Sequence, residues 1–152
     1  MGQVKFWNID VKAFYSIGQR LGQNLKGGEV LTLVSDLGGG KTTLTKGIAK
    51  GANSQDSVSS PSFTICNEYK TPFFRIYHFD FYRLPDPGIV SLELQEILDS
   101  NQKPVVIIEW PLTVEKILPK DYLKIAIEIS GPDLRNLVIY YPPTLKHLLK
   151  DL

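Results

Sequence analysis

The chain has 152 residues, so we expect residues 1–152 to form one domain with a single core and no separate substrate domain. It carries 17 basic and 16 acidic residues, and its formal net charge of +1 excludes the strongly basic surface of a protein that binds nucleic acid tightly by itself. Its one cysteine, Cys66, excludes an internal disulfide and a cysteine-rich zinc site, and it fits a reducing cytosol.

Membrane and export signals are missing from the sequence. No apolar run approaches the roughly 20 residues of a membrane span. The first residues lack the apolar core of a signal peptide, because Lys5 and Asp10 interrupt short apolar pieces. We therefore expect a cytoplasmic protein that does not contact a membrane.

The first third of the chain predicts a helix, a buried strand and a second helix. Asp10 can cap the first helix, which ends before Gly27. Apolar residues recur in this helix at three- and four-residue spacing, at Phe14, Ile17, Leu21 and Leu25. Residues 31–34 form the short apolar run of a buried strand, and residues 44–49 continue a helical pattern that stops at Gly51. A strand followed by a helix is half of a βαβ unit.

The stretch between that strand and the second helix reads Ser35-Asp36-Leu37-Gly38-Gly39-Gly40-Lys41-Thr42-Thr43. This pattern predicts a phosphate-binding P-loop, in which backbone N–H groups and a helix N-terminus face a polyphosphate. Lys41 supplies a charge for the β- and γ-phosphate oxygens, and Thr42 supplies a hydroxyl for magnesium. A glycine-rich turn with an incidental lysine would leave three successive glycines unexplained. Ser35 stands where the usual pattern has glycine, so we expect an altered loop entrance.

The middle of the chain predicts an antiparallel hairpin made of residues 63–69 and 73–81. Alternation along the second strand puts His78 and Asp80 on one face, and Asp80 at the strand's end. His78 could orient Asp80, although a structural histidine explains it equally well. Hydroxyls in residues 60–64 could form a phosphate-sensing switch, but an ordinary serine-rich turn is the favoured interpretation.

A magnesium-nucleotide site also needs an acidic residue at the end of a neighbouring strand. Residues 105–108 form the most strand-like apolar run in the chain, and Glu109 follows them directly. Asp80 follows a run that polar residues interrupt. The pattern favours Glu109 over Asp80 for this role, and either carboxylate could instead cap a loop.

The remaining segments complete an α/β pattern. Residues 92–98 predict a short helix, and residues 123–129 and 137–141 predict two strands paired across a turn at Gly131. A modest helical stripe follows at Leu145, Leu148, Leu149 and Leu152. Trp7 and Trp110 fit either the core or an interface, and Cys66 fits buried packing better than a nucleophile.

Four segments match one known family in order and spacing. They are the loop Asp36 to Thr43, Ser60-Pro61-Ser62-Phe63-Thr64, Tyr77-His78-Phe79-Asp80-Phe81-Tyr82-Arg83-Leu84 and Ile108-Glu109-Trp110-Pro111. Many NTPases share a P-loop, but together with the last two segments the chain resembles the TsaE family, also called YjeE, of bacterial tRNA threonylcarbamoyladenosine biosynthesis. The resemblance spans nearly the whole chain. It implies an α/β, P-loop NTPase-like three-layer sandwich whose mixed, mostly parallel central sheet carries antiparallel edge strands.

The resemblance also implies site residues for Mg-ATP. Lys41 holds phosphates, Thr42 and Glu109 coordinate magnesium, and Asp80 is the other acidic residue of the metal site, so Lys41, Asp80 and Glu109 are the expected catalytic residues. Arg135 matches a family arginine near the nucleotide. The expected nucleotide-binding residues are Asp10, on the adenine side, Leu37, Gly38, Gly39, Gly40, Lys41, Thr42, Thr43 and Arg135.

The resemblance further implies protein partners. Proteins of the family work with TsaD and TsaB, and the threonylcarbamoyl transfer to the adenosine beside the anticodon belongs to TsaD. This chain would then be an accessory ATPase that reaches tRNA only through the complex, without stable nucleic-acid binding of its own. Two other functions stay open, a small-molecule kinase and a nucleotide-sensing module that does not hydrolyse. No arginine-rich lid segment supports the kinase, because the arginines are scattered along the chain.

Overall fold

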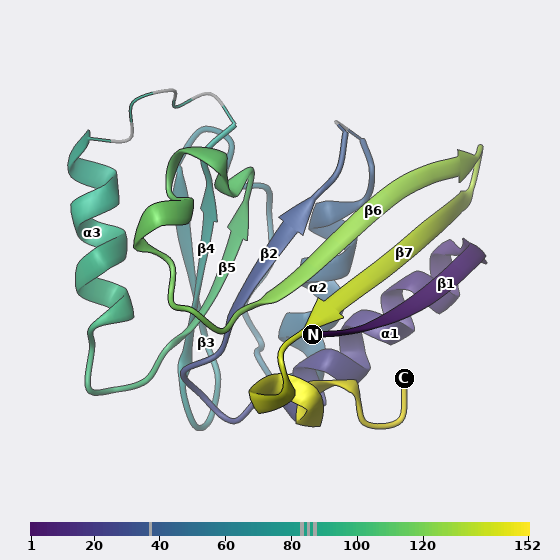
Figure 1. The fold of residues 1–152 in the computed structure, drawn as a ribbon, viewed down its shortest axis with the longest axis horizontal. Helices are drawn as coiled ribbons and strands as arrows, with labels where there is room; N and C mark the ends of the chain where they lie inside the picture. The colour runs from purple at the N-terminus through teal and green to yellow at the C-terminus, as the bar shows by residue number, and fades with distance from the viewer. Residues whose placement is uncertain (37, 83, 85, 87) are drawn as a thin grey trace.

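A mixed β-sheet with helices on both faces forms the centre of the structure, a computed structural model (Figure 1). The structure describes residues 1–36, 38–82, 84, 86 and 88–152. Its strands are β1 (Gly2–Asp10), β2 (Val30–Val34), β3 (Cys66–Lys70), β4 (Arg75–Asp80), β5 (Val105–Glu109), β6 (Leu123–Gly131) and β7 (Leu134–Tyr141). Its α-helices are α1 (Val11–Asn24), α2 (Lys41–Gly51) and α3 (Gly88–Leu98), and its 3-10 helices are η1 (Pro111–Thr113), η2 (Glu115–Ile117) and η3 (Pro143–Leu149).

The strand order, β1-β7-β6-β2-β5-β4-β3, places four parallel strands in the centre of the sheet. β2 pairs in parallel with β5 and β6, and β4 pairs in parallel with β5. The pairs β6–β7, β7–β1 and β3–β4 are antiparallel and lie toward the two edges. This order confirms the predicted mixed sheet with a parallel centre and antiparallel edge strands.

Alternating side chains of the central strand β5 enter two separate cores. Val105 and Ile107 pack in the cluster that contains Phe14 of α1 and Ile48 of α2. Val106 and Ile108 pack in the cluster that contains Leu94 of α3. Because period-two alternation sends neighbouring residues to opposite faces, a continuous apolar strand needs cover on both sides. The result is the predicted three-layer sandwich, with α1 and α2 on one face and α3 on the other (Figure 1).

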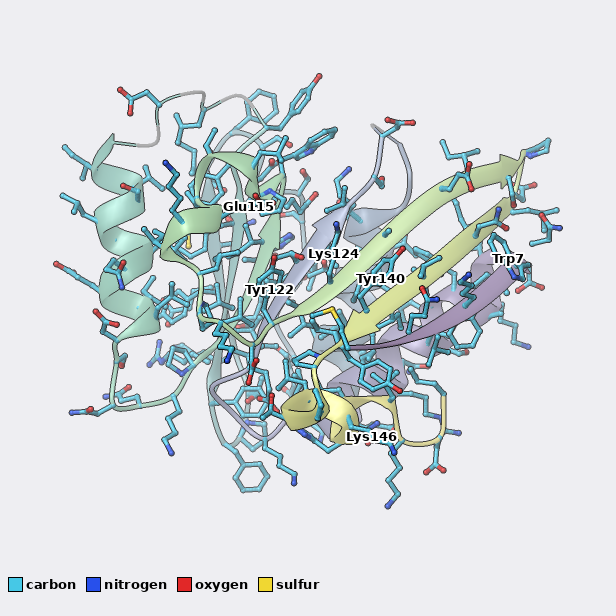
Figure 2. All side chains as sticks on the ribbon, in the orientation of Figure 1. Trp7, Glu115, Tyr122, Lys124, Tyr140 and Lys146 are labelled. Atoms are coloured by element: carbon cyan, nitrogen blue, oxygen red, sulfur yellow. The ribbon has the colours of Figure 1, made fainter. Side chains whose placement is uncertain are left out.

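The half of the sheet formed by β6, β7 and β1 is covered on one face only. No described helix lies over the side of these strands turned toward the viewer in Figure 1. Figure 2 shows Lys124 and Tyr140 on this side and Trp7 at the far end of β1. Lys124 and Tyr140 are register partners, with the lysine Nζ 5.8 Å from the ring centroid. Trp7 is 59% exposed, so it is a surface residue and not part of the core.

Most predicted elements are confirmed, but several differ. α3 begins at Gly88 and not at residue 92, and β7 begins at Leu134 and not at residue 137. The N-terminal strand β1 was not predicted, because only every second side chain is half-buried at this edge position and its apolar pattern is weak. The first hairpin strand begins at Cys66 and not at residue 63, since the Ile65 N–H turns back to the Pro61 carbonyl at 2.6 Å. The final leucine stripe belongs mainly to a 3-10 helix, η3. None of the described helices has the length and apolar character needed to cross a membrane.

The P-loop helix α2 packs directly against the backbone of α1. A Cβ atom added to Gly22 would lie 2.0 Å from the Ile48 carbonyl oxygen, and one added to Gly51 would lie 2.0 Å from the Gln19 carbonyl oxygen. Side chains larger than hydrogen at these positions would force the two helices apart. Near the start of α2, a ring carbon of Phe14 lies 3.2 Å from the position of a Cβ on Gly40. The glycine contacts therefore fix where α2 begins.

Substituting Gly22 tests this contact. Gly22→Ala should lower the free energy of unfolding by about 3 kcal/mol or more, the upper end of the overpacking range, because the added methyl group meets backbone and not a flexible side chain. Urea unfolding followed by circular dichroism measures the change. The exposed neighbour Gln23→Ala is the matched control and should stay within about 0.5 kcal/mol of wild type. A Gly22→Ala protein as stable as wild type would contradict the contact.

Candidate functional site

The candidate site lies at the carboxyl ends of three neighbouring parallel strands. The P-loop follows β2, Asp80 ends β4 and Glu109 ends β5, and the register pairs Asp80 with Glu109 and Glu109 with Leu33. Ligands of open α/β sheets bind at this edge. A cavity of about 250 Å³ lies here, lined by Gly38, Gly39, Gly40, Lys41, Thr42, Thr43, Ser60, Ser62, Asp80, Glu109 and Trp110. The structure thus brings eight of the predicted site residues around one cavity.

The glycines of the loop give it its shape. Gly38 and Gly40 have φ angles of 76° and 104°, in the left-handed region that favours glycine. The Gly39 N–H donates to the Asp36 carbonyl at 3.1 Å and closes the turn. Gly40 is the N-cap of α2, so no capping side chain competes for the N–H groups of the helix's first turn. These free N–H groups make the start of α2 suited to an anion.

Lys41 carries a buried positive charge into this site. Its side chain is 7% exposed, and its Nζ donates to Ser35 Oγ at 3.4 Å and to the Asp36 carbonyl at 3.3 Å. The same Nζ lies 4.9 Å from the centroid of the Trp110 ring. None of the ion pairs among the described residues includes Lys41. A buried charge held only by neutral acceptors and an aromatic face favours an anionic ligand.

Ser35 stands where the usual loop pattern has glycine. Its side chain fits into the loop because it faces Gly39, which has no side chain. Its Oγ donates to the Asp36 carbonyl at 2.7 Å and accepts from Lys41. A Cβ added to Gly39 would lie 2.0 Å from this oxygen. The serine side chain thus occupies space that Gly39 leaves empty, and the loop entrance closes around it.

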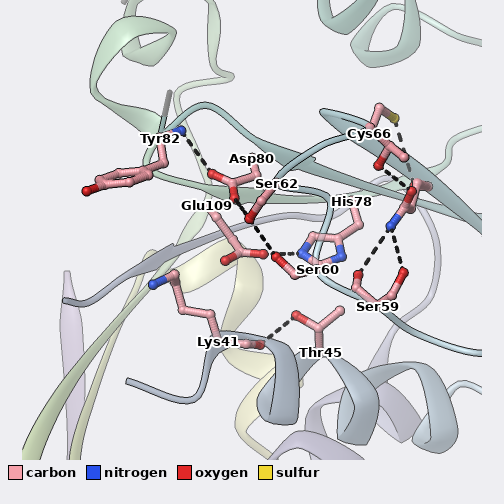
Figure 3. A network of polar contacts seen from close by, with 12 residues as sticks. Lys41, Thr45, Ser59, Ser60, Ser62, Cys66, His78, Asp80, Tyr82 and Glu109 are labelled. Atoms are coloured by element: carbon pink, nitrogen blue, oxygen red, sulfur yellow. Dashed lines mark hydrogen bonds and ion pairs between the residues drawn. The ribbon is translucent and has the colours of Figure 1, made fainter. Parts of the chain in front are cut away.

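Asp80 is held by two hydrogen bonds at the edge of the cavity (Figure 3). Its Oδ1 accepts from the Tyr82 N–H at 2.9 Å, and its Oδ2 accepts from Ser62 Oγ at 3.0 Å. Ser62 Oγ also lies 2.8 Å from Ser60 Oγ. The serine-rich segment therefore contacts the metal-site candidate directly, although an ordinary turn was the favoured interpretation of its sequence.

Glu109 is held by a histidine. His78 Nε2 lies 2.5 Å from Glu109 Oε2, and both side chains are almost fully buried. His78 Nδ1 lies 3.0 Å from the Tyr69 hydroxyl. Of the two sequence interpretations of His78, the one in which it orients Asp80 is not what the structure shows, because its partners are Glu109 and Tyr69. His78 and Asp80 share a face of β4 as predicted, but the imidazole reaches across to β5, the strand paired with β4.

Two titratable groups beside the site have raised pKa values. Burial raises the pKa of Tyr69, so its phenol keeps its proton at neutral pH. Burial, with the nearby carboxylates of Glu93 and Glu68, raises the pKa of Cys66 to about 12. A thiol that stays protonated is a poor nucleophile, which agrees with a packing role for Cys66.

Arg135 reaches the loop from β7. Its Nε donates to the Gly39 carbonyl at 2.9 Å and its Nη2 to the Gly38 carbonyl at 3.3 Å. In a planar peptide the N–H points opposite to the C=O, so holding the Gly39 carbonyl turns the Gly40 N–H away from the arginine. Arg135 therefore orients the loop backbone.

Asp10, a further predicted nucleotide residue, is not among the residues that line the cavity. Asp10 is the N-cap of α1, where its Oδ1 accepts from the Ala13 N–H at 2.8 Å. It pairs with Leu134, next to Arg135, in the β1–β7 register. Leu37 lies outside the described residues.

The oxygen groups of the site fit magnesium. Thr42, Asp80 and Glu109 all line the cavity and offer one hydroxyl and two carboxylates. Among the described residues no cluster of three or more His, Cys, Asp or Glu side chains is arranged to hold a metal ion alone. Magnesium bound with a nucleotide takes only one or two carboxylates and otherwise water and phosphate oxygens. This donor set therefore matches magnesium with phosphates better than an all-protein metal site.

Comparison with known proteins identifies similar chains. The sequence model of a family described as "Threonylcarbamoyl adenosine biosynthesis protein TsaE" matches residues 9–137. The tRNA threonylcarbamoyladenosine biosynthesis protein TsaE of Bacillus subtilis is 37% identical over 137 residues, which are 90% of this chain and 85% of that protein. The protein of the same name from Aquifex aeolicus is 34% identical over 128 residues, 83% of this chain and 87% of that protein. The crystal structure of YdiB from Bacillus subtilis superimposes with a TM-score of 0.77 at 32% identity, over 97% of this chain and 91% of that chain.

A double-mutant cycle tests the Ser35–Gly39 fit. Gly39→Ala alone should lower the free energy of unfolding by about 1–3 kcal/mol, because its methyl group overlaps Ser35 Oγ. Adding Ser35→Gly should recover much of this loss, since the overlapping side chain is then gone. Chemical denaturation of the four proteins gives the coupling energy, expected to be at least about 1 kcal/mol. Strictly additive effects would show that the two residues do not share this space.

Proposed function

Since this chain belongs to the TsaE family of threonylcarbamoyl adenosine biosynthesis proteins, we propose that it is the P-loop ATPase subunit of that tRNA modification. It binds and hydrolyses Mg-ATP in the cytoplasm, in complex with TsaD and TsaB proteins, and reaches tRNA through that complex. One observation carries the proposal. The buried Lys41 ammonium, free of ion pairs within the described residues, shares a cavity with the carboxylates of Asp80 and Glu109 (Figure 3).

The loop and the start of α2 bind the phosphates. Lys41 exchanges its neutral acceptors, Ser35 and the Asp36 carbonyl, for phosphate oxygens and neutralises part of their charge. The N–H groups of the first turn of α2 donate to the same anion. Arg135 keeps the loop backbone in the orientation that this binding needs.

The metal side of the site is built from Thr42, Asp80 and Glu109. These three residues would hold magnesium, which when bound neutralises charge on the phosphate oxygens during transfer. Ser62 and the Tyr82 N–H keep Asp80 in place, and His78 keeps Glu109 in place. Phosphoryl transfer asks mainly for such positioning and charge neutralisation.

Exposed apolar side chains beside the cavity support the proposed partners. Phe63 is 92% exposed and Leu112 is 76% exposed. Phe63 directly follows the cavity residue Ser62, and Leu112 lies two residues after Trp110. Exposed apolar side chains that adjoin cavity residues in the sequence are candidates for a protein–protein contact. A partner bound there would lie against the nucleotide and could complete the catalytic arrangement.

Replacing the loop lysine tests the function. Lys41→Ala should weaken ATP binding by at least about tenfold, the cost of one charge-assisted contact. It should also abolish ATP turnover measured with TsaD and TsaB, while wild-type turnover should be faster with those partners than without them. Lys46→Ala, an exposed lysine on the same helix, is the matched control and should behave as wild type.

Four results would change the assignment. Unchanged ATP affinity in Lys41→Ala would contradict the P-loop. Equal wild-type turnover with and without the partners would contradict the accessory role. Phosphate transferred to a small acceptor would favour a kinase, and tight binding with no turnover under any condition would favour a nucleotide sensor.

A further inference from the structure

The two carboxylates of the site are both connected to one short segment, residues 59–62, which we name the serine loop. Ser62 Oγ donates directly to Asp80 Oδ2 at 3.0 Å. Glu109 is connected to the same loop through two buried side chains, His78 and Tyr69 (Figure 3 shows the histidine end). The Tyr69 hydroxyl donates to the Ser59 carbonyl at 3.2 Å. Polar contacts therefore link Glu109 to the loop, and the one Tyr69 proton can serve only one of its two contacts at a time.

The three side chains of this path are buried, and only its end at the exposed Ser59 reaches the surface. His78 is 0% exposed, and Tyr69 and Glu109 are each 2% exposed. Water does not compete for hydrogen bonds at such positions, so a change at one end alters the bonds at the other. The centroids of the Tyr69 and His78 rings lie 5.9 Å apart. The polar contact between the two residues is made by the Tyr69 hydroxyl and Nδ1 of the imidazole.

The hydrogen bonds of Tyr69 depend on the position of the serine loop, because its hydroxyl has only one proton to donate. A carboxylate only accepts, so the contact of 2.5 Å between His78 and Glu109 is a ring Nε2–H donating to Glu109. In the ring tautomer that carries its proton on Nε2, Nδ1 is an acceptor for Tyr69. The single phenolic proton serves either Nδ1 or the Ser59 carbonyl. Moving the serine loop away gives that proton wholly to His78.

We propose that Tyr69 and His78 are positioning residues that couple the orientation of Glu109 to the conformation of the serine loop. Residues 59–62 then sense the state of the metal site through both carboxylates at once, Asp80 directly and Glu109 through this relay. The inference rests on the proposed function, since it assigns the relay to a magnesium-nucleotide site. Neither residue contacts the nucleotide in this role.

The alternative is that the same bonds only hold the β3–β4 hairpin together. Tyr69 lies on β3 and His78 on β4, so their contact also joins the two strands. Loss of a purely structural bond would lower stability without changing how the protein responds to magnesium. The response to magnesium therefore separates the two roles.

Histidine NMR reads the relay directly. The chain has two histidines, so the ring resonances of His78 and His147 are distinguished by a single His147→Gln variant. Adding Mg²⁺ with a non-hydrolysable ATP analogue should shift the His78 ring nitrogens and leave those of His147 in place. Tyr69→Phe should change the His78 resonances before any ligand is added. Resonances of His78 that respond to neither the ligand nor Tyr69→Phe would overturn the proposal.

Magnesium dependence gives the second readout. Tyr69→Phe removes only the hydroxyl, and it should raise the Mg²⁺ concentration for half-maximal ATP turnover by about tenfold, the usual effect of losing a partner of a metal ligand. Its ATP affinity in EDTA should stay at the wild-type value. Tyr140→Phe, on the open face of the sheet, is the control and should leave both quantities unchanged. An unchanged Mg²⁺ requirement in Tyr69→Phe would overturn the relay.

Failure of the relay and failure of the proposed function give different results. A wild-type protein that does not bind the ATP analogue contradicts the function itself. A wild-type protein that binds the analogue with magnesium, together with a Tyr69→Phe variant that has lost stability but kept its magnesium requirement, contradicts only the relay.

Discussion

A buried charge that has no partner of opposite sign among the residues described by the structure organises the site. Lys41 lies at the start of α2 with only neutral acceptors and the Trp110 ring around its Nζ, although two carboxylates line the same cavity. Those carboxylates are held by their own partners, Asp80 by Ser62 and Glu109 by His78. An unpaired buried charge costs free energy. Lys41 therefore favours the binding of an anion, and the two carboxylates favour the binding of a cation. A magnesium-bound phosphate group supplies both.

The fold keeps these groups apart and aligned. Parallel pairing of β2, β4 and β5 brings the loop and both acidic residues to one edge of the sheet, and backbone contact between α1 and α2 sets the position at which α2 begins. Arg135 adds a constraint from the antiparallel half of the sheet by holding loop carbonyls. The serine loop closes the other side. Its contacts reach Asp80 directly and Glu109 through Tyr69 and His78, and the proposed relay would couple its conformation to the proposed metal site.

Local patterns were sufficient for part of this description. The predicted P-loop, the apolar strands and the strand-end positions of Asp80 and Glu109 follow from contiguous residues, and the sheet confirms the strands and the two strand-end positions. The partner of His78 could not be predicted, because it depends on which strand lies beside β4 and on how far an imidazole reaches across the pair. The fit of Ser35 against Gly39 depends on the fold of the loop itself. β1 was not predicted, because an edge strand buries too few side chains to produce a strong apolar pattern in the sequence.

The most direct test of this account is the affinity of the whole chain for ATP, measured by titration calorimetry in Mg²⁺ and again in EDTA. An anion site at Lys41 combined with a cation site at Asp80 and Glu109 predicts saturable binding of one ATP per chain that is clearly tighter with magnesium. Equal affinity in Mg²⁺ and EDTA would contradict the metal half of the site. Absence of binding at millimolar ATP in both conditions would contradict the account as a whole.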